Sequence, residues 1–174
     1  MDKMRIVPVK VPWQISPSNE IGKCIEDNMD LTISLFCNQS QKVIQTELEK
    51  LAKIYGDNIP DEIYNRVGFS EINLSFNPMV YFGIAFPQVE IFGIDTGKYD
   101  TSEIDQYYFG NMDFHKTWSQ TGICPDPSFY EVIGSNDVLK SNLNIVDNEI
   151  KHWMILGHDE EIHILSRTYE WTEV

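Results

Sequence analysis

The sequence predicts an α+β protein built on a mainly antiparallel β-sheet of five to seven strands, with one principal amphipathic helix packed on one face. Several short segments alternate apolar and polar residues, one segment repeats its apolar residues at helical spacing, and short turns join the strand-like segments. The 174 residues fit a single domain, in which residues 1–20 form an extended arm or an edge strand.

Two patterns predict the first strands. Residues 5–13, RIVPVKVPW, combine β-branched residues with prolines, which is typical of an edge strand because proline cannot donate a backbone hydrogen bond. Residues 31–37, LTISLFC, alternate apolar and polar side chains, the period of a half-buried strand. Cys37 at its end is interpreted as a small buried hydrophobe.

The clearest helix covers residues 40–56. Its apolar face is formed by Ile44, Leu48, Leu51 and Tyr55. These positions are spaced by four, three and four residues, so they share one side of a helix. Ser40 is expected at the N-cap and Gly56 just beyond the C-terminus, and a second short helix is expected from Pro60.

Three strands are predicted next, over residues 69–76, 79–86 and 89–95, joined by Asn-Pro and Pro-Gln turns in an antiparallel meander. Residues 96–118 mix acids with aromatic residues and show little periodicity, which indicates a loop that could include a short helix.

The C-terminal third predicts three further strands. SFYEVIG, residues 128–134, alternates like a strand after a turn stiffened by Pro125 and Pro127. KHWMILGH, residues 151–158, and EEIHILSRTYEW, residues 160–171, flank a turn around Gly157 and are predicted to form a hairpin.

The chain is strongly acidic, with 27 Asp and Glu against 13 Lys and Arg and a formal net charge of −14. Residues 90–161 hold 14 acids and 4 bases, so most of the excess lies there. Such a surface repels nucleic acid and anionic membranes, and neither is expected as a direct partner. Two interpretations remain open: charge that serves solubility alone, and a surface that binds a basic protein.

Cysteine usage and the N-terminus predict a cytoplasmic protein. Cys24, Cys37 and Cys124 form no CxxC pair and leave an odd residue, which indicates reduced thiols. The first residues lack the continuous apolar core of a signal peptide, and no segment approaches the roughly 18 apolar residues of a membrane span.

Cys124 raises the question of a nucleophile because it sits between a glycine turn and two prolines in TGICPDPSFYEV, residues 121–132. A reactive thiol needs a nearby cation or base, whereas the neighbouring Asp126 disfavours the thiolate. The prediction is a structural turn cysteine, with a catalytic one as the alternative.

No catalytic residue, metal site or cofactor is predicted. The histidines of HDEEIH, His158 and His163, are five residues apart and would diverge on a helix or lie on opposite faces of a strand. Markers of nucleotide binding and of serine hydrolases are absent from the sequence. A site assembled from distant residues, for instance His115, His152 and Asp113, remains an alternative.

Acids interleaved with aromatic side chains predict a binding surface for a Lys- and Arg-rich protein, through cation–π contacts and charge-assisted hydrogen bonds. The predicted contact residues are Asp95, Asp100, Glu103, Asp105, Tyr107, Tyr108, Asp113, Asp159, Glu160 and Glu161. The alternative is a solvated loop whose aromatic residues cap the core.

The chain resembles the small acidic immunity proteins that bacteria make against toxins of contact-dependent inhibition and related polymorphic-toxin systems. The resemblance lies in size, acidity, the α+β pattern and the combination of TGICPDPSFYEV with HWMILGHDEEIHILSRTYEW. It implies a protein without chemistry of its own that binds a basic toxin domain, commonly a nuclease, and blocks its active site.

Two other functions stay open beside this expectation. One is a regulatory or scaffold module with a different basic partner. The other is an enzyme with dispersed site residues, which would show a concave pocket with convergent polar groups and shifted pKa values.

Overall fold

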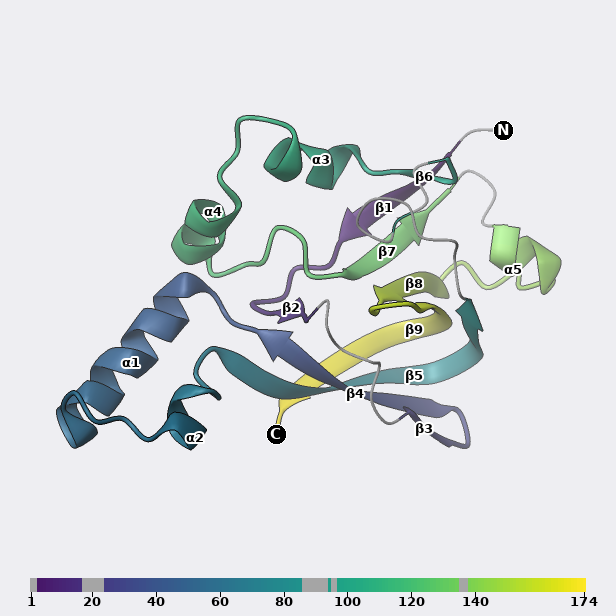
Figure 1. Ribbon diagram of the computed structural model, residues 1–174. Helices are drawn as coiled ribbons and strands as arrows, with labels where there is room; N and C mark the ends of the chain where they lie inside the picture. Colours follow the sequence, from purple (N-terminus) through teal and green to yellow (C-terminus); the bar gives the residue numbers. More distant parts are fainter. Residues whose placement is uncertain (1–2, 17–23, 86–93, 95–96, 135–137) are drawn as a thin grey trace.

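The computed structural model describes residues 3–16, 24–85, 94, 97–134 and 138–174 (Figure 1). These residues form one nine-stranded sheet with five helices, which confirms the α+β class. The strands are β1 (Met4–Pro8), β2 (Gln14–Ile15), β3 (Cys24–Asp27), β4 (Asp30–Asn38), β5 (Phe69–Ala85), β6 (Tyr99–Asp100), β7 (Phe129–Ile133), β8 (Lys151–Leu156) and β9 (Glu161–Glu173). The helices are α1 (Gln41–Tyr55), α2 (Asp61–Tyr64), α3 (Ser102–Tyr108), α4 (Phe114–Thr121) and α5 (Val138–Asn142).

The sheet has more strands than the sequence predicted, and it is mixed. Its order is β2-β4-β5-β9-β8-β7-β1-β6, with β3 also paired to β4. The additional strands include β2 and β6, which have two residues each and are too short to show a period. The pairing of β6 with β1 is parallel, whereas the other strand pairs are antiparallel.

The N-terminal segment joins two distant parts of the sheet. β1 lies between β7 and β6, so it is not an edge strand. The chain then continues past Pro127, whose carbonyl accepts from Ile15, and β2 pairs with β4. The same short segment therefore bridges β7 and β4 and curls the sheet around its apolar face.

The predicted meander is wrong in one respect, because β5 is a single strand of 17 residues. Asn77 and Pro78 lie inside it, joined by a cis peptide bond. The partner β4 begins beyond this point, opposite Phe76, and the β5–β9 register shifts just after Pro78. A proline is accommodated there because few ladder bonds require its missing N–H. The third predicted strand falls largely outside the described residues.

The β8–β9 hairpin is confirmed, and it gives the sheet its two apolar layers. One layer fills the inside of the curl and includes Trp13, Phe76, Phe129, Trp153 and Ile164. The other lies on the outer side of β1, β7 and β8 and includes Ile6, Tyr99, Ile104, Tyr130 and Met154. β8 is buried on both faces from His152 to Leu156 because it contributes to both layers.

The principal helix has its expected ends but not its expected position. Ser40 caps α1 by accepting from the Val43 N–H, and Gly56 follows the helix with φ of 62°. None of its residues is buried. Figure 1 shows α1 and α2 at one end of the molecule, α4 next to the first turn of α1, and α3 beside β1. The region predicted as a loop with a short helix thus supplies two helices, of which α3 covers the outer layer through Ile104.

Candidate functional site

Four of the ten predicted contact residues lie on α3, and Asp100 and Asp113 lie just before α3 and α4. Two buried side chains fix these helices to the body. Ile104 of α3 is 4% exposed and belongs to the outer apolar layer. Trp118 of α4 is 3% exposed, and its indole N–H donates to the Pro12 carbonyl over 2.9 Å. The surface formed by these helices is therefore held on a rigid support.

The aromatic residues of this region hold the two helices together. Phe114 of α4 packs against Tyr107 at 6.4 Å and Tyr108 at 6.2 Å between ring centroids. The Tyr108 hydroxyl donates to Asp126 over 2.6 Å. These aromatic residues therefore pack partly on the protein itself, as in the alternative in which they cap the core. Tyr108 nevertheless remains 37% exposed.

Three of the predicted carboxylates are fixed by local hydrogen bonds. The Ser102 N–H donates to Asp100 over 3.0 Å, the Thr101 hydroxyl to Asp105 over 3.0 Å, and the Lys116 N–H to Asp113 over 2.9 Å. The bond from Ser102 is the main reason that the pKa of Asp100 is lowered. All three carboxylates are held in place by backbone or side-chain donors of α3, α4 and the turn before α3.

Glu103 is the fourth carboxylate of this group. It lies 3.7 Å from the Arg5 guanidinium of β1, with both side chains partly exposed. Ion pairs of this kind contribute little to stability because water competes for both partners. Asp95, the remaining acid predicted for this region, lies outside the described residues.

Two apolar residues at the turn between α3 and α4 are not among the predicted contact residues, although Phe109 belongs to the same stretch of acids and aromatic residues. Phe109 is 73% exposed and Met112 is 43% exposed. They lie between Asp105 and Asp113, so carboxylates border an exposed apolar tip. We name Asp100, Glu103, Asp105, Tyr108, Phe109, Met112 and Asp113 the acidic–apolar surface. The available signal was the stretch YYFGNMDF, residues 107–114, whose apolar residues exceed what two short helices can bury.

The acids of the β8–β9 turn divide into exposed and buried groups. Asp159 is exposed beside His158, and Glu160 is half-buried. Glu161 is a correction to the predicted contact residues, because its side chain is only 3% exposed and its carboxylate faces other residues of the protein. Side chains alternate along β9, so Glu161 lies on the face opposite Ile162 and Ile164, where it is covered by Tyr99 and His163.

Glu161 begins a chain of hydrogen bonds with two histidines. Its Oε1 lies 2.6 Å from Nε2 of His163, and Nδ1 of His163 lies 2.8 Å from Nε2 of His152. The Tyr99 hydroxyl donates to the same Oε1 over 2.8 Å, and the Lys98 ammonium lies 3.5 Å away. Five side chains from β6, β8, β9 and the residue before β6 thus form one polar cluster, which we name the His–Glu cluster.

Opposing effects determine the ionisation of Glu161. Burial raises the pKa of this carboxyl, but the hydrogen bonds from His163 and Tyr99 and the nearby charge of Lys98 lower it to about 2. The carboxylate is therefore charged at neutral pH and accepts the Nε2 proton of His163. Nδ1 of that ring and Nε2 of His152 share the second hydrogen bond of the chain.

The His–Glu cluster opens into a cavity of about 170 Å³ beneath α5. The cavity is lined by Met4, Lys98, Tyr99, Leu139, Asn142, His152 and His163. Among the described residues that line it there is no serine, threonine or cysteine to act as a nucleophile. The cavity nevertheless has the convergent polar groups that the enzyme alternative requires, and the carboxyl with the shifted pKa, Glu161, lies behind them and bonds His163 and Tyr99.

The cluster differs from the dispersed site that the sequence left open. His152 joins His163 across the hairpin, whereas His115 contacts Phe114 on α4. The register of the hairpin could have shown this, because Met154 pairs with His163 and His152 lies two residues before Met154 on the same face. Within the described part of the chain, no group of three or more His, Cys, Asp or Glu is placed to hold a metal ion.

Cys124 is buried at 1% exposure, and burial is the main reason that its pKa is raised. The adjacent Asp126 accepts hydrogen bonds from the hydroxyls of Tyr108 and Tyr130. The thiol is therefore stabilised in its protonated form, and the TGICPDP segment forms a fixed corner before β7.

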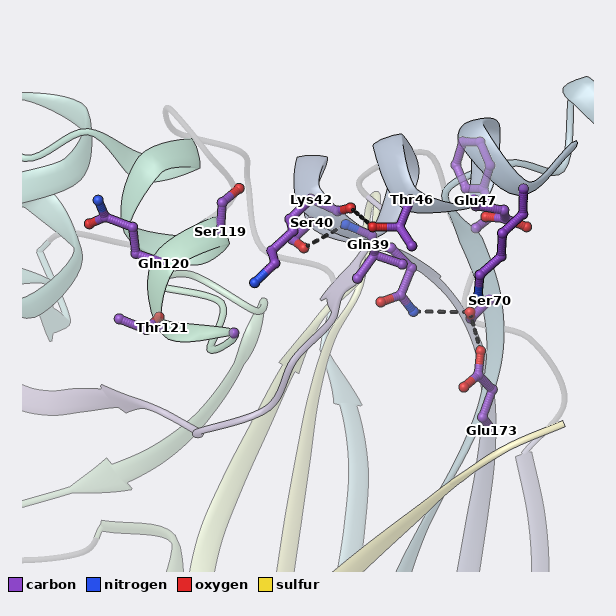
Figure 2. Close-up of a pocket in the computed structure, with 14 residues that line it drawn as sticks. Gln39, Ser40, Lys42, Thr46, Glu47, Ser70, Ser119, Gln120, Thr121 and Glu173 are labelled. Atoms are coloured by element: carbon purple, nitrogen blue, oxygen red, sulfur yellow. Dashed lines mark hydrogen bonds between the residues drawn. The ribbon is translucent and has the colours of Figure 1, made fainter. Parts of the chain in front are cut away.

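A second and larger cleft, of about 890 Å³, lies between the first turns of α1 and the last turn of α4 (Figure 2). Its lining is mainly polar and includes Ser40, Thr46, Ser119 and Gln120. Its charged residues are two lysines, Lys42 and Lys50, and two glutamates, Glu47 and Glu173. Because these charges balance, the cleft has no clear preference for a charged ligand.

Comparisons with known proteins leave the chain without a family. No protein family matches its sequence, and neither curated proteins nor solved structures are significantly similar to it. Of the helices in the described residues, none combines the length and apolarity needed to cross a membrane.

Proposed function

We propose that this protein is an immunity protein that neutralises a basic toxin domain, a nuclease, by binding over the toxin's active site in the cytoplasm. The observation that supports this function best is the acidic–apolar surface. An exposed phenylalanine and methionine, bordered by fixed carboxylates, match a partner whose apolar pocket is surrounded by lysine and arginine.

The proposed contact combines burial of an exposed apolar side chain with pairing of carboxylates and cations. Phe109 can bury a large apolar area in a partner, and contacts of this kind dominate the energy of protein interfaces. Asp100, Asp105 and Asp113 are fixed before binding, so little side-chain entropy is lost when they meet cations. The net charge of −14 would also accelerate encounter with a basic partner at low salt.

A nuclease fits this surface because it must itself be basic to hold the phosphate backbone. An acidic inhibitor can then compete with nucleic acid for the same cations. A regulatory protein with another basic partner would use the same contacts, and it differs from an immunity protein in that its partner does not kill cells.

The proposal is tested by capturing basic proteins from the native host and expressing each captured domain with and without this chain. We expect one domain to arrest growth alone and to be harmless in the presence of this protein. Capture of domains that are all harmless without the chain would contradict the immunity function.

The surface is tested by reversing Asp100, Glu103 and Asp105 to lysine together. Binding to the captured toxin should weaken at least a hundredfold, and calorimetry would measure the loss. The matched control reverses Glu49, Asp57 and Glu62, three exposed acids on or near α1 and α2. It changes the net charge equally, so an equal loss in both variants would contradict the assignment of this surface.

A further inference from the structure

We propose that the cavity beneath α5 binds a small carboxylic acid with an apolar body, and that the His–Glu cluster takes up a proton when this ligand binds. The site is independent of the toxin-binding function proposed above.

The volume and the lining of the cavity indicate which apolar group of a ligand it would accept. Its volume of about 170 Å³ is close to that of apolar cavities that accept a benzene ring, roughly 150 Å³. Met4 and Leu139 form apolar walls, and the ring of Tyr99 forms part of the lining. Binding sites for small molecules combine walls of this kind with a few placed polar groups.

Lys98 provides the group that would recognise a carboxylate. It lines the cavity with its side chain 45% exposed, and its ammonium lies 4.7 Å from the centroid of the Tyr99 ring. The ammonium is therefore held at the boundary between the cavity and solvent. A ligand whose ring or branched chain enters the cavity would place its carboxylate against this cation.

Charge balance explains why a proton should accompany the ligand. The charged groups of the cluster are Glu161 and Lys98, which neutralise each other, while Tyr99 and the two histidines complete its titratable groups. A bound carboxylate adds one negative charge to a largely buried site, and such a charge is costly unless it is compensated.

The histidine pair can supply that compensation. A proton added to the His152–His163 pair is stabilised by the Glu161 carboxylate, which bonds His163, and both rings line the cavity that the ligand enters. The described residues of α5 that line the cavity, Leu139 and Asn142, are neutral and do not compete for the proton. Ligand and proton together leave the net charge of the site unchanged.

The test uses benzoate as the probe, with benzyl alcohol and benzylamine as analogues of the same size. We expect calorimetry to show saturable binding of benzoate and affinity that increases about tenfold when the pH falls from 8 to 7, since one proton is taken up. The heat should also depend on the ionisation enthalpy of the buffer. No saturable benzoate binding to the folded protein, equal binding of the alcohol, or an affinity independent of pH would each overturn the proposal.

Two variants locate the site. Lys98→Met should weaken benzoate binding at least tenfold, whereas Lys116→Met, which removes the same charge from exposed α4, should not. Leu139→Trp should fill the cavity and abolish binding with little change in melting temperature, because α5 lies at the surface. Unchanged affinity in Lys98→Met or in Leu139→Trp would place the ligand elsewhere and overturn the assignment.

Discussion

At the scale of single residues, Glu161 couples the stability of the fold to pH. Its pKa is about 2 in the folded protein and about 4.5 in a free side chain. The unfolded chain therefore binds this proton more tightly, so the stabilisation is complete above about pH 4.5 and is lost as the pH falls towards 2. A shift of this size corresponds to roughly 3 to 3.5 kcal/mol.

We predict that Glu161→Gln lowers the free energy of unfolding by about 2 to 3 kcal/mol at pH 7. The difference from the wild type should shrink to about half at pH 3, because the wild-type carboxylate loses its advantage there. Urea unfolding at both pH values measures this change.

Asp159→Asn is the control for this experiment. Asp159 lies in the same turn with its side chain 70% exposed, and we expect its replacement to cost less than about 0.5 kcal/mol at either pH. A stability difference for Glu161→Gln that does not change between pH 7 and pH 3 would contradict the proposed ionisation of the carboxylate.

At the scale of elements, local sequence determined where α1 begins and ends but not where it packs. Ser40 and Gly56 act on the backbone within a few residues, and both occupy the predicted caps. The position of the helix depends on residues far along the chain. Ile44 contacts Gly68, where an added Cβ would lie 2.7 Å from Ile44 Cγ1, so α1 packs on the segment before β5 instead of on the sheet.

The acidic–apolar surface and the His–Glu cluster show the same difference between residues that are close in sequence and residues that are far apart. The carboxylates around α3 could be predicted as a group because they are close in sequence. The His–Glu cluster could not be assembled in the same way, because Tyr99 reaches Glu161 from 62 residues away. Only the His152–His163 part was accessible from the sequence, through the register of a hairpin that had itself been predicted correctly.

We predict that the backbone amides of α1 exchange with solvent well before those of β9. α1 buries none of its residues, whereas β9 is paired on both sides by β5 and β8. Local opening of the helix therefore exposes little apolar surface and costs less free energy than separating the strands. Hydrogen exchange followed by NMR measures both elements in one sample.

α4, which is shorter but buries Trp118, is the internal comparison and should exchange more slowly than α1. Equal protection of α1 and β9 would mean that the helix packs more tightly than described.

At the scale of the whole molecule, the N-terminal segment determines the curvature of the sheet. The prolines of residues 5–13 predict an edge strand. In the structure they are compatible instead with a segment that changes its pairing partner. β1 pairs with β7 up to Pro8, and pairing resumes only at β2, with β4. Trp13 lies between the two pairings. Its ring stacks on Phe129 at 6.3 Å and meets Trp171 edge-on at 6.0 Å.

Trp13 is fully buried and joins residues from β7 and β9, so Trp13→Ala should cost about 3 to 5 kcal/mol and lower the cooperativity of unfolding. Trp171→Ala removes the same side chain at a position that is 38% exposed and should cost less than half as much. Urea unfolding followed by far-UV circular dichroism compares the two variants. Equal losses would mean that the N-terminal segment adds only local packing, whereas a larger loss at Trp13 identifies it as the residue through which the two sides of the curled sheet are joined.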